Sequence, residues 1–129
     1  MNKSYSNKTP MSCCYRLHAI RFGHREAVIL FHFMFWIKHN RKNNQHYHNK
    51  LYWSYGSISD LKKYYFPFWS EGQVRRGIQS LLKQNVIIKD NFNKMKYDKT
   101  SWYALRDEKY WMTKYNPVDE IDNWESRYR

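Results

Sequence analysis

Residues 70–105 read SEGQVRRGIQSLLKQNVIIKDNFNKMKYDKTSWYAL. Ser70 is a favourable helix N-cap, and the apolar spacing that follows it predicts a helix over residues 71–84. Three segments of different character come next: a β-branched strand at Val86–Lys89, a polar, basic turn at Asp90–Thr100 and a returning strand at Ser101–Leu105. This stretch therefore predicts a helix that leads into a basic β-hairpin.

The segment before this stretch supplies a preceding helix. Ser57 can cap a helix over Ile58–Tyr65. The run Phe66–Trp69 ends that helix, because Pro67 disfavours helical geometry in the residue before it. Further upstream, Leu51–Tyr55 is expected to be a short strand, and residues 40–50 a polar loop.

Two more helices are expected nearer the N-terminus, and a short one near the C-terminus at 108–114. The first covers Ser12–Phe22 and stops at Gly23, and the second covers His24–His39. The second is apolar nearly all round, which is typical of a helix at the centre of a fold or in a subunit interface. Since a domain of this size does not need so much apolar circumference, we expect a homodimer through Ser12–His39.

The expected order is helix, helix, strand, helix, helix, strand, turn, strand. It predicts an α+β fold that is mainly helical, namely a winged helix-turn-helix with a small antiparallel β-sheet. At 129 residues the chain has room for one domain. We expect a flexible N-terminal arm at residues 1–11, the winged-helix domain at 12–114 and a mildly acidic C-terminal tail at 115–129.

The helix over residues 71–84 has an apolar side and a polar side. The apolar residues have the spacing i, i+4, i+7 and i+8, and they form one stripe: Val74, Ile78, Leu81 and Leu82. The opposite side and its flank carry Gly72, Gln73, Arg75, Arg76, Gln79, Ser80 and Lys83. Arginine can bind guanine and glutamine can bind adenine through paired hydrogen bonds, while lysine and serine hold phosphates. The polar side therefore fits a helix that reads the major groove of DNA, and on its periodicity alone it fits an ordinary solvent-exposed helix face at least as well.

Two neighbouring segments add positive charge. The basic turn carries lysines that can rest on the sugar-phosphate backbone, and the preceding helix carries Lys62 and Lys63, which can clamp phosphates. The predicted DNA contacts are Lys62, Lys63, Ser70, Gln73, Arg75, Arg76, Gln79, Ser80, Lys83, Lys94, Lys96 and Lys99.

The composition also favours a polyanionic partner. There are 23 Lys and Arg against 11 Asp and Glu, which gives a formal net charge of +12. The basic excess lies in residues 1–106, whereas residues 107–129 are mildly acidic. Such an excess argues for DNA, RNA or an acidic protein surface as the partner. Because aromatic residues make up 19% of the chain, we expect some of them to be exposed, where they can stack on bases or pack against a partner.

Four segments of the chain resemble one protein family: Glu26–Trp36, Phe66–Ser70, Val74–Leu81 and Asn91–Tyr103. They are similar to the N-terminal winged-helix domain of DnaD-like replisome organisers, the replication-initiation proteins of low-GC Gram-positive bacteria and their phages. The resemblance covers roughly residues 13–110. It implies a double-stranded DNA-binding or self-assembling module that acts in replication initiation or its control, in the cytoplasm of a bacterial or phage-infected cell.

The chain departs from this family in two places. Gly77 lies inside a helix, where glycine costs about 1 kcal/mol relative to alanine, and the family has a bulkier residue there. The family's C-terminal region does not follow Arg129, so we expect a fragment or a stand-alone relative. A stand-alone winged helix is also compatible with a transcriptional regulator. A further alternative is a phage regulator or inhibitor, of the anti-CRISPR kind, that docks on a host replication or defence protein or nucleoprotein complex through its basic aromatic surface.

Signatures of catalysis and metal binding are missing from the sequence. No Ser-His-Asp, paired-carboxylate or glycine-loop motif occurs, so we do not expect an enzyme. The pairs Cys13-Cys14 and His46-x-His48 lack zinc-site spacing, so we expect no metal, no other cofactor and no disulfide framework. The longest apolar run, Ala27–Ile37, is shorter than the roughly 20 residues that span a bilayer, so we expect no membrane partner.

Overall fold

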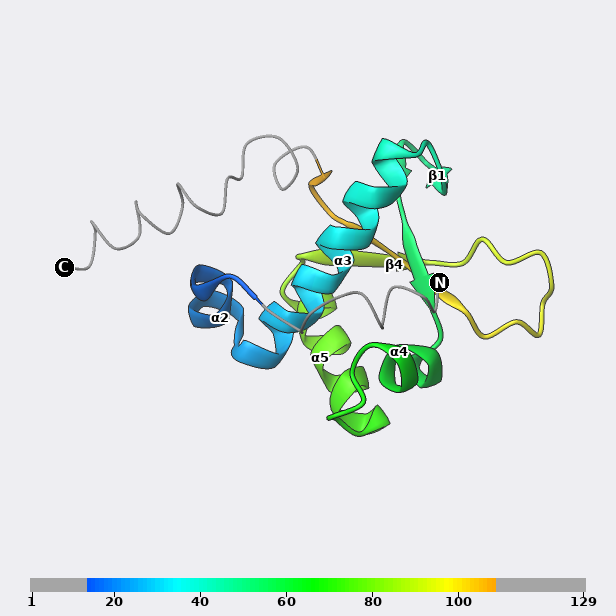
Figure 1. Cartoon of the computed structure of the whole chain (residues 1–129). Coiled ribbons are helices and arrows are strands. Elements are labelled where there is room, and N and C mark those ends of the chain that lie inside the picture. Colours follow the sequence, from blue (N-terminus) through cyan, green and yellow to red (C-terminus); the bar gives the residue numbers. More distant parts are fainter. Residues whose placement is uncertain (1–13, 109–129) are drawn as a thin grey trace.

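The structure, a computed structural model, describes residues 14–108 (Figure 1). The predicted arm at 1–11 and tail at 115–129 lie outside this range, as does all but the first residue of the helix expected at 108–114. The described elements are α2 (Arg16–Phe22), α3 (His24–Lys42), β1 (Tyr47–His48), β2 (Leu51–Tyr52), β3 (Ser54–Gly56), α4 (Ile58–Tyr64), α5 (Glu71–Lys83), β4 (Ile87–Asp90) and β5 (Ser101–Leu105). The described part is thus an α+β fold with small antiparallel sheets, and the coarse fold class is confirmed.

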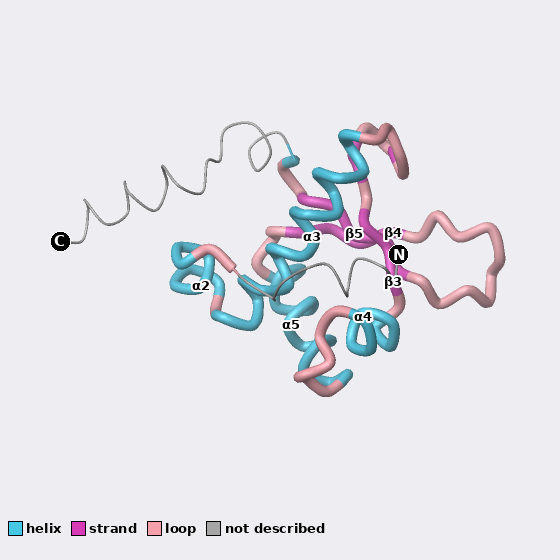
Figure 2. The backbone as a smooth tube through the Cα atoms, in the orientation of Figure 1, coloured by secondary structure: helices cyan, strands magenta, loops and turns pink. Residues whose placement is uncertain are grey.

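Helix α3 lies at the centre of the fold, in contact with α2, α5, β3 and β5 (Figure 2). Its buried apolar residues are Ala27, Val28, Ile29, Leu30, Phe33, Trp36 and Ile37. The domain itself therefore covers most of the apolar circumference from which we expected a dimer. Phe35 on α3 and Ile20 on α2 remain 42% and 54% exposed. A dimer through Ser12–His39 stays a prediction, on a smaller apolar surface than the sequence suggested.

Helix α3 ends at Lys42, three residues beyond the predicted end at His39. The reason is a tertiary contact. Asn40 is buried, and its Nδ2 donates a 2.7 Å hydrogen bond to the carbonyl oxygen of Trp53 at the start of the sheet. The last turn of α3 is therefore anchored to a segment 13 residues further along the chain.

The expectation of a loop over residues 40–50 was wrong in part, since this segment also contains β1. Strands β1 and β2 pair antiparallel around a two-residue turn. The turn residues, Asn49 and Lys50, have φ angles of 52° and 66°. Such left-handed geometry at both central positions is typical of a type I′ hairpin turn, which glycine usually marks in a sequence. Because Lys50 stands where glycine is usual, the sequence lacks the pattern by which such a hairpin is normally predicted.

The strand expected at 51–55 is divided at Trp53 and continues to Gly56. Strand β2 pairs with β1, whereas β3 pairs with β5 in a different sheet. Trp53 lies between them with 1% of its surface exposed, and its Nε1 donates a 2.8 Å hydrogen bond to the carbonyl oxygen of His48. Burial of this indole separates the two short strands.

Both predicted helix caps that precede the basic hairpin are confirmed. The Ser57 hydroxyl accepts a 3.1 Å hydrogen bond from the Asp60 N–H at the start of α4. Ser70 and Gln73 form a capping box at the start of α5, in which each side chain accepts a hydrogen bond from the other residue's backbone N–H. Between the two helices Phe66, 1% exposed, anchors the turn in the core. The two helices pack against each other.

Strand β5 is the central strand of a three-stranded antiparallel sheet with the order β3-β5-β4. Tyr103 on β5 lies opposite Ser54 on β3 and Lys89 on β4. The strands predicted at 86–89 and 101–105 are confirmed, the first with its bounds shifted by one residue. Residues 91–100, the β4–β5 loop, project from the body of the domain (Figure 2).

Gly77 lies at the contact between α5 and α3. A Cβ atom at this position would collide with Cδ1 of Ile29 and would lie 3.3 Å from the Arg25 side chain. Ile29 is fully buried, so its tip has no open space to move into. The glycine that weakens the helix locally therefore allows α5 and α3 to approach each other closely.

We expect Gly77→Ala to lower the free energy of unfolding by about 1–2 kcal/mol, although alanine is the better helix former. Ile29→Val removes only the methyl group that would collide, and costs about 1 kcal/mol alone. The double variant should be more stable than the sum of the single changes predicts, because the new methyl fills the vacated space. Urea unfolding of the four proteins measures this coupling.

Gly72→Ala is the matched control on the same helix. There the nearest heavy atom to a new Cβ is the tip of the exposed Arg76 side chain, at 3.3 Å, and it can move into solvent. This variant should be at least as stable as the unmodified protein. A Gly77→Ala protein that is more stable than the unmodified one would contradict the close approach of the two helices.

Candidate nucleic-acid interface

Helix α5 presents an exposed polar surface, here the α5 face, which consists of Arg75, Arg76, Gln79 and Lys83. The buried side consists of Val74, Gly77, Ile78 and Leu81. Because Gly77 is buried and Leu82 is only half-buried, the buried direction is rotated by about 35° from the one expected from the apolar residues alone. The outward direction therefore moves away from Gln73 and Ser80.

The side chain of Arg76 lies back along α5 toward its N-terminus. Its Nη1 is 3.3 Å from the position that a Cβ would take at Gly72, so the absence of a side chain there leaves room for the guanidinium. The same position lies 3.8 Å from the Ser70 hydroxyl. The cation thus sits over the first turn of α5, where the helix dipole adds further positive potential.

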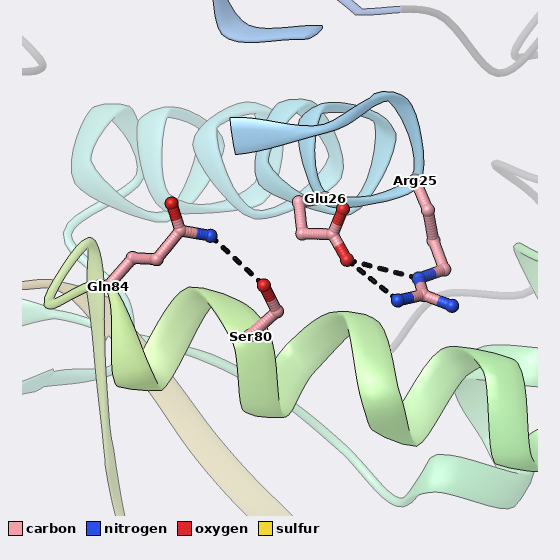
Figure 3. Close-up of polar contacts among 4 residues, drawn as sticks. All are labelled: Arg25, Glu26, Ser80 and Gln84. Atoms are coloured by element: carbon pink, nitrogen blue, oxygen red, sulfur yellow. Dashed lines mark hydrogen bonds and ion pairs between the residues drawn. The ribbon is translucent and has the colours of Figure 1, made fainter. Parts of the chain in front are cut away.

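Three predicted contact residues make hydrogen bonds within α5. The capping box engages the Ser70 hydroxyl and the side-chain oxygen of Gln73 at 3.1 and 2.9 Å. Ser80 is half-buried, and its hydroxyl accepts a 3.0 Å hydrogen bond from Gln84. Figure 3 shows Ser80 and Gln84 on the side of α5 that faces the start of α3, where Arg25 and Glu26 form an ion pair of 2.9 Å. These side chains contribute to the geometry of α5 rather than to the α5 face.

Helix α4 carries the next two predicted contacts, and it packs against α5. Lys63 is exposed, and its Nζ lies 5.3 Å from the centre of the Tyr64 ring. Lys62 is half-buried and donates a 3.4 Å hydrogen bond to the carbonyl oxygen of Pro67. Lys63 is therefore the better placed of the two to bind a phosphate beside the α5 face.

The β4–β5 loop carries the remaining predicted contacts, and all of them are exposed: Lys94, Lys96 and Lys99. Asn93 holds the loop together, because its Nδ2 donates to the carbonyl oxygens of Asp98 and Thr100 at 3.1 and 2.6 Å. The backbone N–H of Thr100 donates to the Asp98 carboxylate at 2.9 Å and lowers the pKa of that carboxyl group. This network gives the loop a defined shape.

Aromatic side chains fix the base of this loop, and their positions were not predicted from the sequence. Phe92 stacks on His48 of β1 with ring centres 4.3 Å apart. Trp102 of β5 lies 5.6 Å from Phe92, and its Nε1 donates a 2.8 Å hydrogen bond to the Asn93 side chain. At the outer part of the loop Tyr97 is 77% exposed. The aromatic residues within this basic stretch could have indicated that the loop is packed against the sheet at its base.

The structure thus brings the α5 face and α4 together, while the lysines of the β4–β5 loop lie on a separate projection (Figure 1). No family model matches this chain, and no curated protein and no solved structure shows significant similarity to it. No helix within residues 14–108 is long and apolar enough to cross a membrane. In the same range no three histidine, cysteine, aspartate or glutamate side chains are grouped so that they could hold a metal ion.

Proposed function

We propose that this domain is a winged helix that binds double-stranded DNA. Helices α4 and α5 with their short connection correspond to a helix-turn-helix, and the β4–β5 loop to the wing. The sheet order β3-β5-β4, with the hairpin after the second helix of the pair, supports this interpretation. The resemblance to DnaD-like replisome organisers adds the proposal that binding serves replication initiation or its control.

The α5 face is the observation that carries the DNA-binding proposal. Two arginines, a glutamine and a lysine point outward from a helix whose opposite side is fixed in the core. A helix with such a face fits the major groove, where arginine and glutamine can bind base edges. Lysines on α4 and in the β4–β5 loop would bind phosphates, and they would position the helix without reading sequence. The formal charge of +12 supports the same partner.

Substitutions on α5 and in the β4–β5 loop should affect DNA binding in different ways. Arg76→Ala should reduce the difference in binding free energy between a preferred site and random duplex by about 1–3 kcal/mol, because it removes contacts to base edges. Lys94→Ala and Lys96→Ala should weaken binding to both sequences alike and lower the salt slope by about one each. Fluorescence anisotropy with selected and scrambled duplexes measures both quantities.

Arg106→Ala is the control for loss of a positive charge, since Arg106 is exposed beyond the end of β5 and lies outside the α5 face. Its effect should be limited to a small, sequence-independent loss of affinity. If Arg76→Ala lowers affinity for all sequences equally, α5 does not read bases, and its role is limited to phosphate contacts.

Exposed apolar side chains favour a second candidate function, docking on a host protein or nucleoprotein complex. Phe68 at the turn before α5 is 57% exposed, and Met95 and Tyr97 in the β4–β5 loop are 51% and 77% exposed. Aromatic and methionine side chains beside arginines are enriched at protein interfaces. If Arg76→Ala, Lys94→Ala and Lys96→Ala leave DNA binding intact while Phe68→Ala and Tyr97→Ala abolish capture of a host protein, this second function replaces the first.

A further inference from the structure

A hollow separate from the α5 face lies between the C-terminal half of α3, the segment that follows it and β3. We call it the α3–β3 hollow; its volume is about 250 Å³. None of the predicted DNA contacts lines it. A molecule bound in the hollow would therefore be recognised independently of the proposed contact between the α5 face and the major groove of DNA.

A buried hydroxyl group in the hollow lacks a hydrogen-bond partner. Ser54, the first residue of β3, is 1% exposed, and within the part of the chain that the structure describes its Oγ makes no hydrogen bond. Buried polar groups in folded proteins are nearly always paired, since an unpaired one costs about 1–3 kcal/mol. Ser54 is one of the residues that line the hollow, so its hydroxyl is the lining group there that still needs a hydrogen-bond partner.

Aromatic rings form much of the wall around this hydroxyl. From α3, Trp36 and His39 meet edge to face with ring centres 5.4 Å apart. His46, in the segment after α3, and Tyr55 of β3 also meet nearly edge to face, with ring centres 4.9 Å apart. Ring walls of this kind favour a flat, aromatic guest.

The remaining lining groups offer both donors and acceptors. Gln45 and Asn40 contribute amides, and Asn40 is held in place by its bond to the Trp53 carbonyl oxygen. Burial lowers the pKa of His46, which keeps its imidazole neutral, with one donor and one acceptor nitrogen. Arg41 and Lys42, both exposed in the last turn of α3, add positive charge near the hollow.

We propose that the α3–β3 hollow binds a nucleobase, with the Ser54 hydroxyl and the neighbouring amide and imidazole groups bonded to its polar edge. The guest is flat and aromatic, to match the rings, and it carries both donors and acceptors, to match the polar lining. An anionic phosphate attached to it would meet the basic end of α3. Two sources supply this chemistry, a free nucleotide and an unpaired base in a single strand.

Titrations followed by ¹H–¹⁵N NMR test the proposal on the full chain. The probes are the nucleoside monophosphates AMP, GMP, CMP and UMP, with ribose 5-phosphate as the control that lacks a base. At least one nucleotide should produce saturable shifts at the amides of Ser54 and Tyr55, and ribose 5-phosphate should not. Equal shifts with ribose 5-phosphate, or no shifts with any nucleotide or oligonucleotide, would overturn the proposal.

A short single-stranded oligonucleotide and its abasic counterpart distinguish the two sources. If the strand binds the hollow more tightly than the mononucleotides, and only when bases are present, an unpaired base is the natural guest. If the mononucleotides bind and the strand does not, the guest is a free nucleotide. Duplex binding at the α5 face, measured separately, is expected to be unaffected by any of these outcomes.

Ser54→Ala separates a ligand contact from a structural role. Removal of an unpaired buried hydroxyl should leave the melting temperature unchanged or raise it, while nucleotide binding becomes about 3- to 10-fold weaker. Tyr55→Leu should weaken binding by at least about fivefold through loss of stacking, whereas Tyr47→Leu, on the exposed β1 hairpin outside the hollow, should have no effect. If Ser54→Ala destabilises the fold and leaves binding intact, Ser54 is structural and the proposed recognition of the base is wrong.

Discussion

The affinity for duplex DNA is expected to fall by about three orders of magnitude between 50 and 200 mM salt. Each phosphate contact releases counterions and contributes about 0.9 to the log–log slope, so six lysine contacts give a slope near −5. Six predicted lysines can supply them: Lys62, Lys63, Lys83, Lys94, Lys96 and Lys99. Fluorescence anisotropy at a series of salt concentrations measures the slope.

The three lysines of the β4–β5 loop make this expectation specific. A variant with Lys94, Lys96 and Lys99 replaced by alanine should have a slope about three units shallower. Lys42→Ala, at the end of α3 and away from α5, is the control and should leave the slope unchanged. A protein that does not bind duplex at 50 mM salt would contradict the DNA-binding proposal and favour docking on a protein partner.

The free energy of unfolding is expected to fall by about 3–4 kcal/mol between pH 7.5 and pH 5, because the fold holds two histidines, the buried His18 and the half-buried His32, in neutral form. Burial lowers the pKa of His32 to about 3. Burial, reinforced by the charge of Arg21, lowers the pKa of His18 to about 4. In the unfolded chain both titrate near 6.5, so below that pH the unfolded state binds more protons. The contribution of the two histidines to the free energy of unfolding is therefore fully present well above pH 6.5. It is lost as the pH falls toward 3–4, at about 1.4 kcal/mol per pH unit for each histidine.

His32→Phe tests the assignment. The imidazole of His32 lies 4.6 and 5.2 Å from the rings of Tyr65 and Phe66, and phenylalanine keeps a ring in that place while it removes the titrating nitrogens. Urea unfolding should show a pH dependence about half as steep as in the unmodified protein. Above pH 7 both histidines are neutral in the folded and the unfolded chain, so the variant's effect there reports packing alone. Equal pH dependence in the two proteins would show that His32 does not cause the acid instability.

Most of the helices and the β4–β5 hairpin could be predicted from the sequence because their signals are local. Ser57 and Ser70 cap helices through hydrogen bonds with backbone N–H groups three residues later in the sequence, and both caps were predicted correctly. The helix spacing of Val74, Ile78, Leu81 and Leu82 identified the buried side of α5 to within about 35°. The error came from two residues: Gly77, which an apolar pattern does not count and which the fold buries, and Leu82, which the pattern counts and which is only half-buried.

The candidate site was predictable in its charges and less so in its geometry. The lysines of the β4–β5 loop and the arginines of α5 are exposed, as expected from their position in a polar turn and on a polar helix face. The sequence pattern put Ser80 among the predicted DNA contacts on the polar side of the helix, yet Ser80 is half-buried and hydrogen-bonded to Gln84. The Asn93 network and the stack of Phe92 on His48 involve partners that no short-range pattern connects.

By itself, then, the sequence determined the order of the helices, the basic hairpin and the outward charge of α5, because capping, periodicity and turn chemistry act over a few residues. Only the tertiary structure decided that Gly77 is a contact point between helices, since that depends on Ile29 across the core. It alone divided the strand at Trp53 and joined Ser54, Tyr55 and His46 to the end of α3 in one hollow. These features rest on side chains that are distant in sequence and meet only when the core is packed.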